Sequence, residues 1–474
     1  MPHRSSAFRL NLPIFTPRLL LTGILMLGLV VRLAFLARNW NNLEFDASFL
    51  LHAEVARGIT NGNWFEVNQQ YLESYVLQCR AEKRLIDPED FPPPATEHLV
   101  PLYNDEGGYG MLLAATWKVF GAKRWWYIRV IQIVLDVVMC WMVFEVGRKA
   151  FSRTSGIIAG GLYAVFIPGI EMAVRPHRDI WVTFLFITSV YLLVRGGISS
   201  PPQARLPLAR YALLAAAAGV VTWMRSTPVL FIPFLIVILA LTISWREAVR
   251  GGIVMAAVFS LLLAPLVIRN YSVFGKFMAT RGSMWHSFWA GVGQMPNPYG
   301  LIDDDDAVVR FTHSIDSTVV YQTDAYELTL RRQAMELLRD RPIWYATTVV
   351  RRATLFVFPK LGRAVFFQPV PEEHKAGVIN KSLAPAIPIV ADVLLGGFFL
   401  AGLWMGRRRW KLLLLTGSPY FYTAITLAPI YITGRNIANV YYFVFLVGAS
   451  AVEHILPDRF RKDSSPPPIS PLSA

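Results

Sequence analysis

The sequence predicts an all-α membrane protein whose chain crosses the bilayer about ten times. Of its 474 residues, 54% are apolar and only 16% are charged, whereas soluble globular proteins carry roughly a quarter charged residues. The mean hydropathy is +0.41, and long apolar runs bounded by charged residues are typical of membrane-spanning helices. This composition excludes a single soluble domain, a disordered chain, a collagen-like chain and a disulfide-rich scaffold.

The basic charge fits a membrane protein. The formal net charge is +14, which in a soluble protein would suggest a nucleic-acid partner. In a membrane protein Lys and Arg gather in cytoplasmic loops and near anionic headgroups, so membrane lipid is the expected partner and nucleic acid is not. The two cysteines, Cys79 and Cys140, fall in a polar loop and in an apolar run, so no disulfide or thiolate metal site is expected.

Ten apolar runs are candidates for membrane spans. A helix needs about 20 residues to cross about 30 Å of hydrocarbon. The ten runs cover residues 19–37, 125–146, 156–172, 180–194, 211–223, 229–245, 252–268, 387–405, 412–430 and 437–456. The run at 211–223 is short for a span.

Basic residues give the orientation of these spans. The first run follows Arg4, Arg9 and Arg18 and has no small-residue cleavage site, so it is expected to be a retained span with a cytoplasmic N-terminus. Counting onward, short basic turns become cytoplasmic, as the positive-inside rule expects. These turns are 147–155, 195–210, 246–250 and 407–411.

The same count divides the chain into three parts. Residues 1–18 are a cytoplasmic tail, 19–456 form the membrane domain, and 457–474 are a Pro/Ser-rich cytoplasmic tail expected to be disordered. The loops at about 38–124 and 269–386 lie outside the cytoplasm. Function is expected where these loops meet the helical bundle.

The segment 342–359 tests this orientation, because it is nearly apolar enough to be a span. Arg351 and Arg352 stand at its middle, where a charge would cost several kcal/mol in hydrocarbon. We therefore expect a helix lying in the outer membrane interface.

The first outer loop begins with acidic residues. Glu44 and Asp46 directly follow the first span, and the apolar spacing of the residues up to Gly58 predicts an amphipathic helix on the membrane surface. A carboxylate at the start of a helix caps it and interacts well with its dipole. Asp46 is thus either a cap or a general base at the membrane surface.

Two further acids, Asp105 and Glu106, end the same loop in front of an apolar run at 111–120. This run is too short to span, so we expect a second interfacial helix. Each of its two acids is again either a helix cap or a residue of the reaction.

Metal ligands are not apparent in the outer loops. Three of the eight histidines, His52, His98 and His177, are too scattered for a catalytic zinc site. The four aspartates at 303–306 cannot all face one ion and show no EF-hand spacing, so a solvated loop is the favoured interpretation. No cofactor is assigned, and a divalent cation stays open.

Several arginines fall on the outer side, against the orientation rule. They are Arg175, Arg178, Arg225, Arg269 and Arg435, and Asp179 and Asn270 stand beside two of them. A guanidinium group matches phosphate oxygens and keeps its charge, so phosphate binding would explain these arginines. Ion pairing with the outer acids is the alternative.

In this order, the residues resemble the bacterial relatives of the protein O-mannosyltransferase and aminoarabinose-transferase superfamily, which are GT-C class membrane glycosyltransferases. The most specific part is 264–293, with a proline near the end of a span, Arg-Asn-Tyr at 269–271 and Phe-Gly-Lys-Phe at 274–277. The acid after the first span, the basic turn at 148–156 and the Thr-to-Pro turn at 222–228 support it. The resemblance extends over about 19–456.

This resemblance implies a transferase of the cell (inner or plasma) membrane with its active site on the non-cytoplasmic side. It would move a sugar from a polyprenyl-phosphate carrier to an envelope lipid, polysaccharide or protein. Asp46 is the implied base, assisted by Asp105 or Glu106. Arg269, Arg225, Arg178 and Arg435 are the candidates for contact with the donor phosphate, and Asp179 matches the acid after the third span of the family.

Direct displacement at the anomeric carbon would invert its configuration.

Two other classes of protein stay open. A lipid or polysaccharide transporter would need charged residues within spans, and Asp136 and Asp392 lie in or near spans. A non-catalytic partner of another membrane protein would use the outer loops for binding. No internal repeat is apparent, which disfavours a transporter built from duplicated halves.

Overall fold

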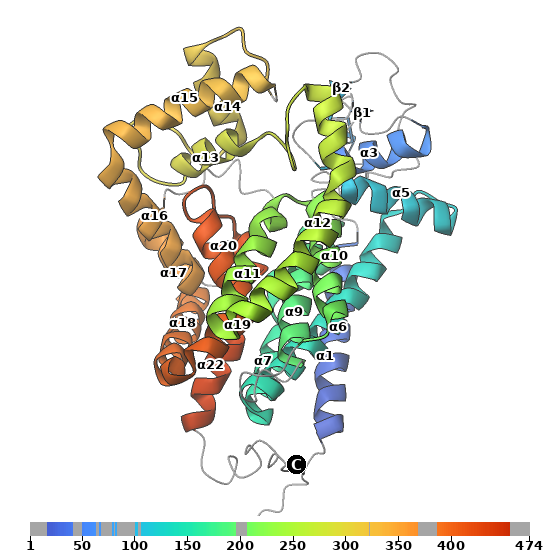
Figure 1. Cartoon of the computed structure of the whole chain (residues 1–474), viewed down its shortest axis with the longest axis vertical. Helices are drawn as coiled ribbons and strands as arrows, with labels where there is room; N and C mark the ends of the chain where they lie inside the picture. Colours follow the sequence, from blue (N-terminus) through green and yellow to red (C-terminus); the bar gives the residue numbers. More distant parts are fainter. Residues whose placement is uncertain are drawn as a thin grey trace, which may run out of the picture.

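The protein is almost entirely helical. The computed structural model describes residues 17–40, 50–62, 66–67, 78–79, 81–82, 100–102, 106–195, 206–321, 323–367 and 386–455. A long bundle occupies one part of the molecule, and a layer of shorter helices covers one end of it (Figure 1).

The first part of the bundle is formed by α1 (Pro17–Arg38), α6 (Trp125–Ala150), α7 (Arg153–Ala164), α8 (Ile167–Val174), α9 (Asp179–Arg195), α10 (Leu208–Met224), the 3₁₀ turn η2 (Thr227–Leu230), α11 (Phe231–Thr242) and α12 (Trp245–Phe274). The C-terminal part adds α18 (Ala386–Gly406), η4 (Arg407–Arg409), α19 (Trp410–Thr416), α20 (Ser418–Leu427), α21 (Gly434–Ala438) and α22 (Tyr442–Ile455). A continuous apolar core joins the two parts.

The covering layer comes from the two predicted outer loops. The first loop contributes α3 (Leu50–Thr60), β1 (Glu66–Val67), β2 (Val100–Pro101) and α5 (Gly108–Phe120). The second contributes α13 (Met284–Gly293), α14 (Asp305–Ile315) and α15 (Asp324–Asp340), followed by α16 (Pro342–Val357) and α17 (Pro359–Phe366), which run from the layer along the side of the bundle (Figure 1). The two short strands pair antiparallel, with Glu66 opposite Pro101. In Figure 1, α3 and α5 lie on one side of this end and α13 to α15 on the other.

The apolar helices identify a multi-pass membrane protein. Within the described residues, four helices are long and apolar enough to cross a membrane: Arg18–Arg38, Trp125–Ala150, Trp245–Phe274 and Ile387–Thr416. A fifth span results if α7 and α8, bent by 54°, count as one. The predicted count of about ten is not confirmed, because the helices in other predicted runs, such as α11 and α22, are only 12 and 14 residues long.

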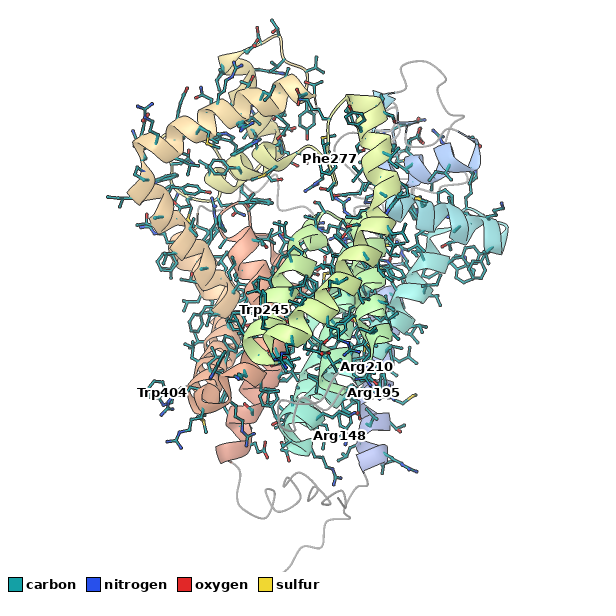
Figure 2. The ribbon with its side chains drawn as sticks, in the orientation of Figure 1. Arg148, Arg195, Arg210, Trp245, Phe277 and Trp404 are labelled. Carbon is teal, nitrogen blue, oxygen red and sulfur yellow. The ribbon has the colours of Figure 1, made fainter. Side chains whose placement is uncertain are left out.

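Two of the predicted basic turns, 147–155 and 195–210, lie toward one end of the bundle. Figure 2 shows Arg148, Arg195 and Arg210 toward the end opposite Phe277, which lies beside the covering layer. The predicted helices at 47–58 and 111–120 are present as α3 and α5. They pack closely, because a Cβ atom on Gly110 would come within 2.5 Å of Val55.

A buried arginine forms a hydrogen bond with the end of α7, at the break between α7 and α8. Arg32 of α1 is fully buried and donates to the carbonyl oxygens of Gly28 (2.8 Å) and Ala164 (2.9 Å), the last residue of α7. It also pairs with Asp136 of α6 at 2.5 Å, and Tyr163 donates to the same carboxylate at 2.8 Å. Asp136 therefore has structural partners, as does Asp392, which accepts the N–H groups of two residues in the first turn of α17 at 3.0 Å.

A second buried arginine joins the covering layer to the bundle. Arg352 of α16 is fully buried and donates to the carbonyl oxygens of Ala428 and Ile430, both at 3.2 Å, just beyond α20. It also donates to Gly291 of α13. We name this arrangement the Arg352 clasp. It keeps the guanidinium group of this amphipathic helix away from hydrocarbon.

Replacing Gly291 by Ala is expected to destabilise the protein by about 1–3 kcal/mol, because the clasp leaves no space for a side chain. A Cβ atom there would lie 1.9 Å from the carbonyl oxygen of Ile430. Gly397 of α18 is the matched control, since its Cβ atom would meet nothing within 4 Å. In detergent, the midpoint of thermal unfolding should fall for Gly291→Ala and not for Gly397→Ala. Equal midpoints for the two variants would contradict this packing.

The acidic run at 303–306 is only in part the solvated loop that the sequence predicts, because Asp303 and Asp304 are half-buried whereas Asp305 and Asp306 are exposed. Asp303 accepts a hydrogen bond from Tyr431 at 2.9 Å, and Asp304 caps α14 by accepting the N–H of Asp306 at 3.4 Å. Asp305 lies 3.0 Å from His286 Nε2. The run therefore starts a helix and links it to α13 and to the residues after α20.

The covering layer also holds a pH-sensitive acid, Glu327 of α15. Its carboxylate accepts the N–H groups of Trp285 (2.8 Å) and His286 (3.3 Å) at the start of α13. Burial raises the pKa of Glu327 to about 7, although these two N–H groups lower it.

The folded protein binds the proton of the Glu327 carboxyl group more tightly than the unfolded chain does. The stabilisation that this protonated side chain provides is therefore fully present at pH values below its ordinary pKa of 4.5. It is lost as the pH rises through about 7, a loss of up to about 3 kcal/mol. Unfolding midpoints measured between about pH 4 and about pH 8 should fall with pH in the wild type and less in Glu327→Gln. Parallel profiles would remove Glu327 as the cause.

Candidate functional site

Asp179 is the centre of a charged cluster at the end of the bundle beneath the covering layer. It is the first residue of α9 and is fully buried. Its carboxylate forms an ion pair with Arg225, which follows α10. His177 Nδ1 lies 3.0 Å and Arg435 Nε lies 3.7 Å from Oδ2 of the same carboxylate. Three separate parts of the chain therefore converge on one acid.

The charges around Asp179 determine its ionisation. Burial would raise the pKa of Asp179, but Arg225, His177 and Arg435 hold it well below its ordinary value. Burial lowers the pKa of Arg225 to about 10, against the attraction of Asp179. Both groups are therefore charged at neutral pH and form a buried ion pair.

Arg225 is fixed by further hydrogen bonds. Its Nη2 donates to Asn436 Oδ1 of α21 at 3.1 Å, and its Nε donates to Thr227 Oγ1 at 3.1 Å. These bonds hold η2 and α21 against the start of α9. The arginine therefore has a defined position in the cluster.

Glu106 is the second buried acid of the cluster, with 2% of its surface exposed. Its carboxylate lies 3.3 Å from Arg178 Nη1 and 3.8 Å from Arg281 Nε. The interpretation of Glu106 as a helix cap is wrong, because the N-cap of α5 is Gly107, which has a φ of 78°. Glu106 instead belongs to the arginine cluster.

Close backbone packing brings Glu106 to this place. A Cβ atom on Gly108 would lie 2.4 Å from the carbonyl oxygen of Trp223. Only glycine allows the start of α5 to approach the end of α10 so closely. The same approach brings Glu106 next to Arg178, which also donates to the Met224 carbonyl at 3.3 Å.

The described part of the cluster has more guanidinium groups than carboxylates. Arg178, Arg225, Arg281 and Arg435 surround Asp179 and Glu106. The side chains of Arg281 and Arg435 are 30% and 47% exposed, whereas those of Arg178 and Arg225 are 14% and 15% exposed. Arg281 and Arg435 are therefore the more accessible to an anionic ligand.

Arg269 and Asn270 support the segment that leads to Arg281. Arg269 Nη1 donates to the Leu102 carbonyl and to Asn270 Oδ1, both at 2.9 Å. Asn270 Nδ2 donates to the carbonyls of Met278 (3.0 Å) and Thr280 (3.2 Å). The contact between Arg269 and donor phosphate stays a prediction.

Three predicted site residues, Glu44, Asp46 and Asp105, lie outside the described residues. The described residues contain no group of three or more His, Cys, Asp or Glu side chains that could hold a metal ion. The possible divalent cation therefore stays a prediction.

The sequence interpretation missed two residues of the cluster. Arg281 follows the Phe-Gly-Lys-Phe segment on the outer side and could have been included with the other outer arginines. His177 was considered only as a metal ligand. Its position two residues before Asp179 gave no indication that its ring would contact Arg435.

One protein family matches part of the chain. Residues 108–268 match the family model of dolichyl-phosphate-mannose-protein mannosyltransferase. No curated protein sequence matches the chain.

Solved structures with partial similarity include two membrane glycosyltransferases. The oligosaccharyltransferase AglB from Archaeoglobus fulgidus, in complex with an inhibitory peptide and a dolichol-phosphate, has 12% identity and a TM-score of 0.49 over 93% of this chain and 51% of that chain. ArnT from Cupriavidus metallidurans in the apo state has 14% identity and a TM-score of 0.32 over 85% of this chain and 72% of that chain. The chain spans about half the length of the archaeal protein.

The matched segment runs from α5 into α12 and includes Arg178, Asp179 and Arg225. The resemblance predicted from the sequence is thus confirmed, and residues 108–268 carry the sequence pattern of the dolichyl-phosphate-mannose-protein mannosyltransferase family, a family of GT-C glycosyltransferases.

Proposed function

We propose that this protein transfers a sugar from a polyprenyl-phosphate carrier to an envelope lipid, polysaccharide or protein. The observation that carries this proposal is the convergence of four arginines on the buried acids Asp179 and Glu106, beside the covering layer. The family match over 108–268 supports the reaction class.

The arginines would act on the leaving group. As the bond between the anomeric carbon and the phosphate oxygen breaks, its electron pair moves to the phosphate, which gains negative charge. Guanidinium groups fixed before the reaction stabilise such charge without reorganisation. Arg281 and Arg435 are the more exposed and would contact the phosphate, while Arg178 and Arg225 are held by Glu106 and Asp179.

The acceptor would be activated by a carboxylate. An acceptor hydroxyl forms the new bond to the anomeric carbon and gives its proton to the base, which must lie within about 3 Å of it. Asp46 is the proposed base, with Asp105 or Glu106 assisting. A single displacement from the face opposite the phosphate inverts the anomeric configuration.

The site would lie on the non-cytoplasmic side of the cell membrane. Arg148, Arg195 and Arg210 lie toward the opposite end of the bundle (Figure 2), and short basic turns favour the cytoplasm. The cluster and the covering layer would then face outward, where Arg281 and Arg435 could meet a lipid headgroup.

The transporter alternative loses its support from the sequence. It rested on Asp136 and Asp392, and these acids pair with Arg32 and with the first turn of α17. Neither is left as a charge that requires a transported ion or lipid to explain it.

Transfer of radiolabel tests the proposal directly. Purified membranes containing the protein, incubated with labelled polyprenyl-phosphate sugar, should form a covalent labelled product. Membranes without the protein should form none. Translocation or binding of label with no covalent product would overturn the proposal in favour of a transporter or a non-catalytic partner.

Replacing Arg435 by Ala is expected to lower kcat/KM for the lipid-linked donor by about 10- to 100-fold, since a charge-assisted phosphate contact is worth about 1.5–3 kcal/mol. Arg310→Ala is the matched control, because Arg310 lies on α14 and its side chain is 69% exposed. Donor titrations that coincide for the two variants would remove Arg435 from the donor site.

A further inference from the structure

Both ring nitrogens of His177 contact residues of the charged cluster. Its Nε2 lies 2.5 Å from Arg435 Nη1, and its Nδ1 lies 3.0 Å from Asp179 Oδ2. Guanidinium nitrogens only donate hydrogen bonds. Nε2 is therefore placed to accept from Arg435, and Nδ1 lies 3.0 Å from both the backbone nitrogen of Asp179, whose N–H group points to it, and Oδ2 of the same residue.

The surrounding charges keep this ring neutral. His177 is 4% exposed, and the charged groups that face it include Asp179, Arg435, Arg225 and Arg178. Burial and the three arginines lower the pKa of His177 well below its ordinary value, although Asp179 raises it. The acceptor on Nε2 is therefore available at neutral pH.

Arg435 needs such a partner because little else restrains it. It lies on α21, a helix of only five residues capped by Thr433, and its side chain is 47% exposed. Its Nε is 3.7 Å from Asp179, which is long for a hydrogen bond. A long side chain loses rotamer freedom on binding a ligand, and a fixed partner reduces that cost.

We propose that His177 is a positioning residue that holds the Arg435 guanidinium group beside Asp179 so that its other terminal nitrogen, Nη2, can bind a lipid phosphate. Nη1 is occupied by His177, and among the described residues Nη2 makes no hydrogen bond. The ligand class, a lipid phosphate, rests on the proposed function.

The test compares side chains that keep or lose an acceptor at the Nε2 position. Gln is long enough to place an amide oxygen near this position, whereas Asn reaches only the Nδ1 position and Leu provides no acceptor. Binding of polyprenyl phosphate to the purified protein is followed by tryptophan fluorescence. We expect His177→Leu and His177→Asn to weaken binding by about tenfold, and His177→Gln to stay within about threefold of the wild type.

A double variant separates positioning from a general loss of structure. If His177 acts through Arg435, His177→Leu should cause no further loss of affinity in an Arg435→Ala background. An added loss of about tenfold in that background, or equal affinities for the Gln and Asn variants, would overturn the proposal. His313→Leu is the control, because His313 bonds the Val319 carbonyl in the covering layer at 3.0 Å.

A measurement without ligand distinguishes this proposal from the proposed function. The coupling between positions 177 and 435 is obtained from the thermal unfolding of the two single variants, the double variant and the wild type. Additive effects would show that the two side chains do not interact and would overturn the positioning role. A clear coupling in a protein that binds no polyprenyl phosphate would instead overturn the proposed function.

Discussion

Replacing Asp46 by Asn is expected to lower the rate of sugar transfer by a factor of about 10²–10⁴, the usual contribution of a general base. The amide is similar in size but cannot take the proton of the acceptor hydroxyl. The rate is measured as label transferred from polyprenyl-phosphate sugar at saturating donor. Asp46 precedes α3, which begins at Leu50, so the base would stand directly before a helix of the covering layer.

The control for this substitution is Asp340→Asn, which changes an exposed acid at the end of α15 and should leave transfer unchanged. Thermal unfolding of Asp46→Asn should match the wild type. If transfer continues at the wild-type rate, the base lies elsewhere. The same substitution at Asp105 and Gln in place of Glu106 would then identify it.

Replacing Asp179 by Asn is expected to destabilise the folded protein by about 3–5 kcal/mol and to reduce transfer at least about 100-fold. Arg225 would keep its buried position next to α9 but lose its counter-charge, and an uncompensated buried charge is costly. Arg435 and His177 would lose the same partner, so the donor site would also lose its arrangement.

Glu145→Gln is the matched control for that variant, because it makes the same change in an accessible ion pair. Glu145 lies 2.8 Å from Arg148, whose side chain is 42% exposed, and such pairs contribute about 0–1 kcal/mol. Both variants are compared by unfolding in the same detergent. A similar small loss for both would mean that the Asp179 cluster is not a buried, interdependent unit.

The helices of this protein could largely be predicted from the sequence, but their interruptions could not. The apolar run at 156–172 was interpreted as one span, yet α7 ends at Ala164 and α8 begins at Ile167. A count of apolar residues cannot detect such a bend. Pro168, in the first turn of α8, and Pro419, in the first turn of α20, were the available signals, because proline favours the start of a new helix.

The site could be predicted in its residue types but not in its pairings. Outer arginines and acids were apparent because their charges contradict the orientation rule. That Arg225 would bind Asp179, 46 positions away, depends on how α9, α10 and α21 pack together. A sequence gives no measure of such packing, and the same limit explains why the contact between His177 and Arg435 was missed.

The Arg352 clasp restricts how the molecule can open. It fastens α16, the end of α13 and the residues beyond α20 at one point. Helices tied in this way can tilt about that point but cannot lift away from the bundle unless a buried cation gives up several carbonyl partners at once.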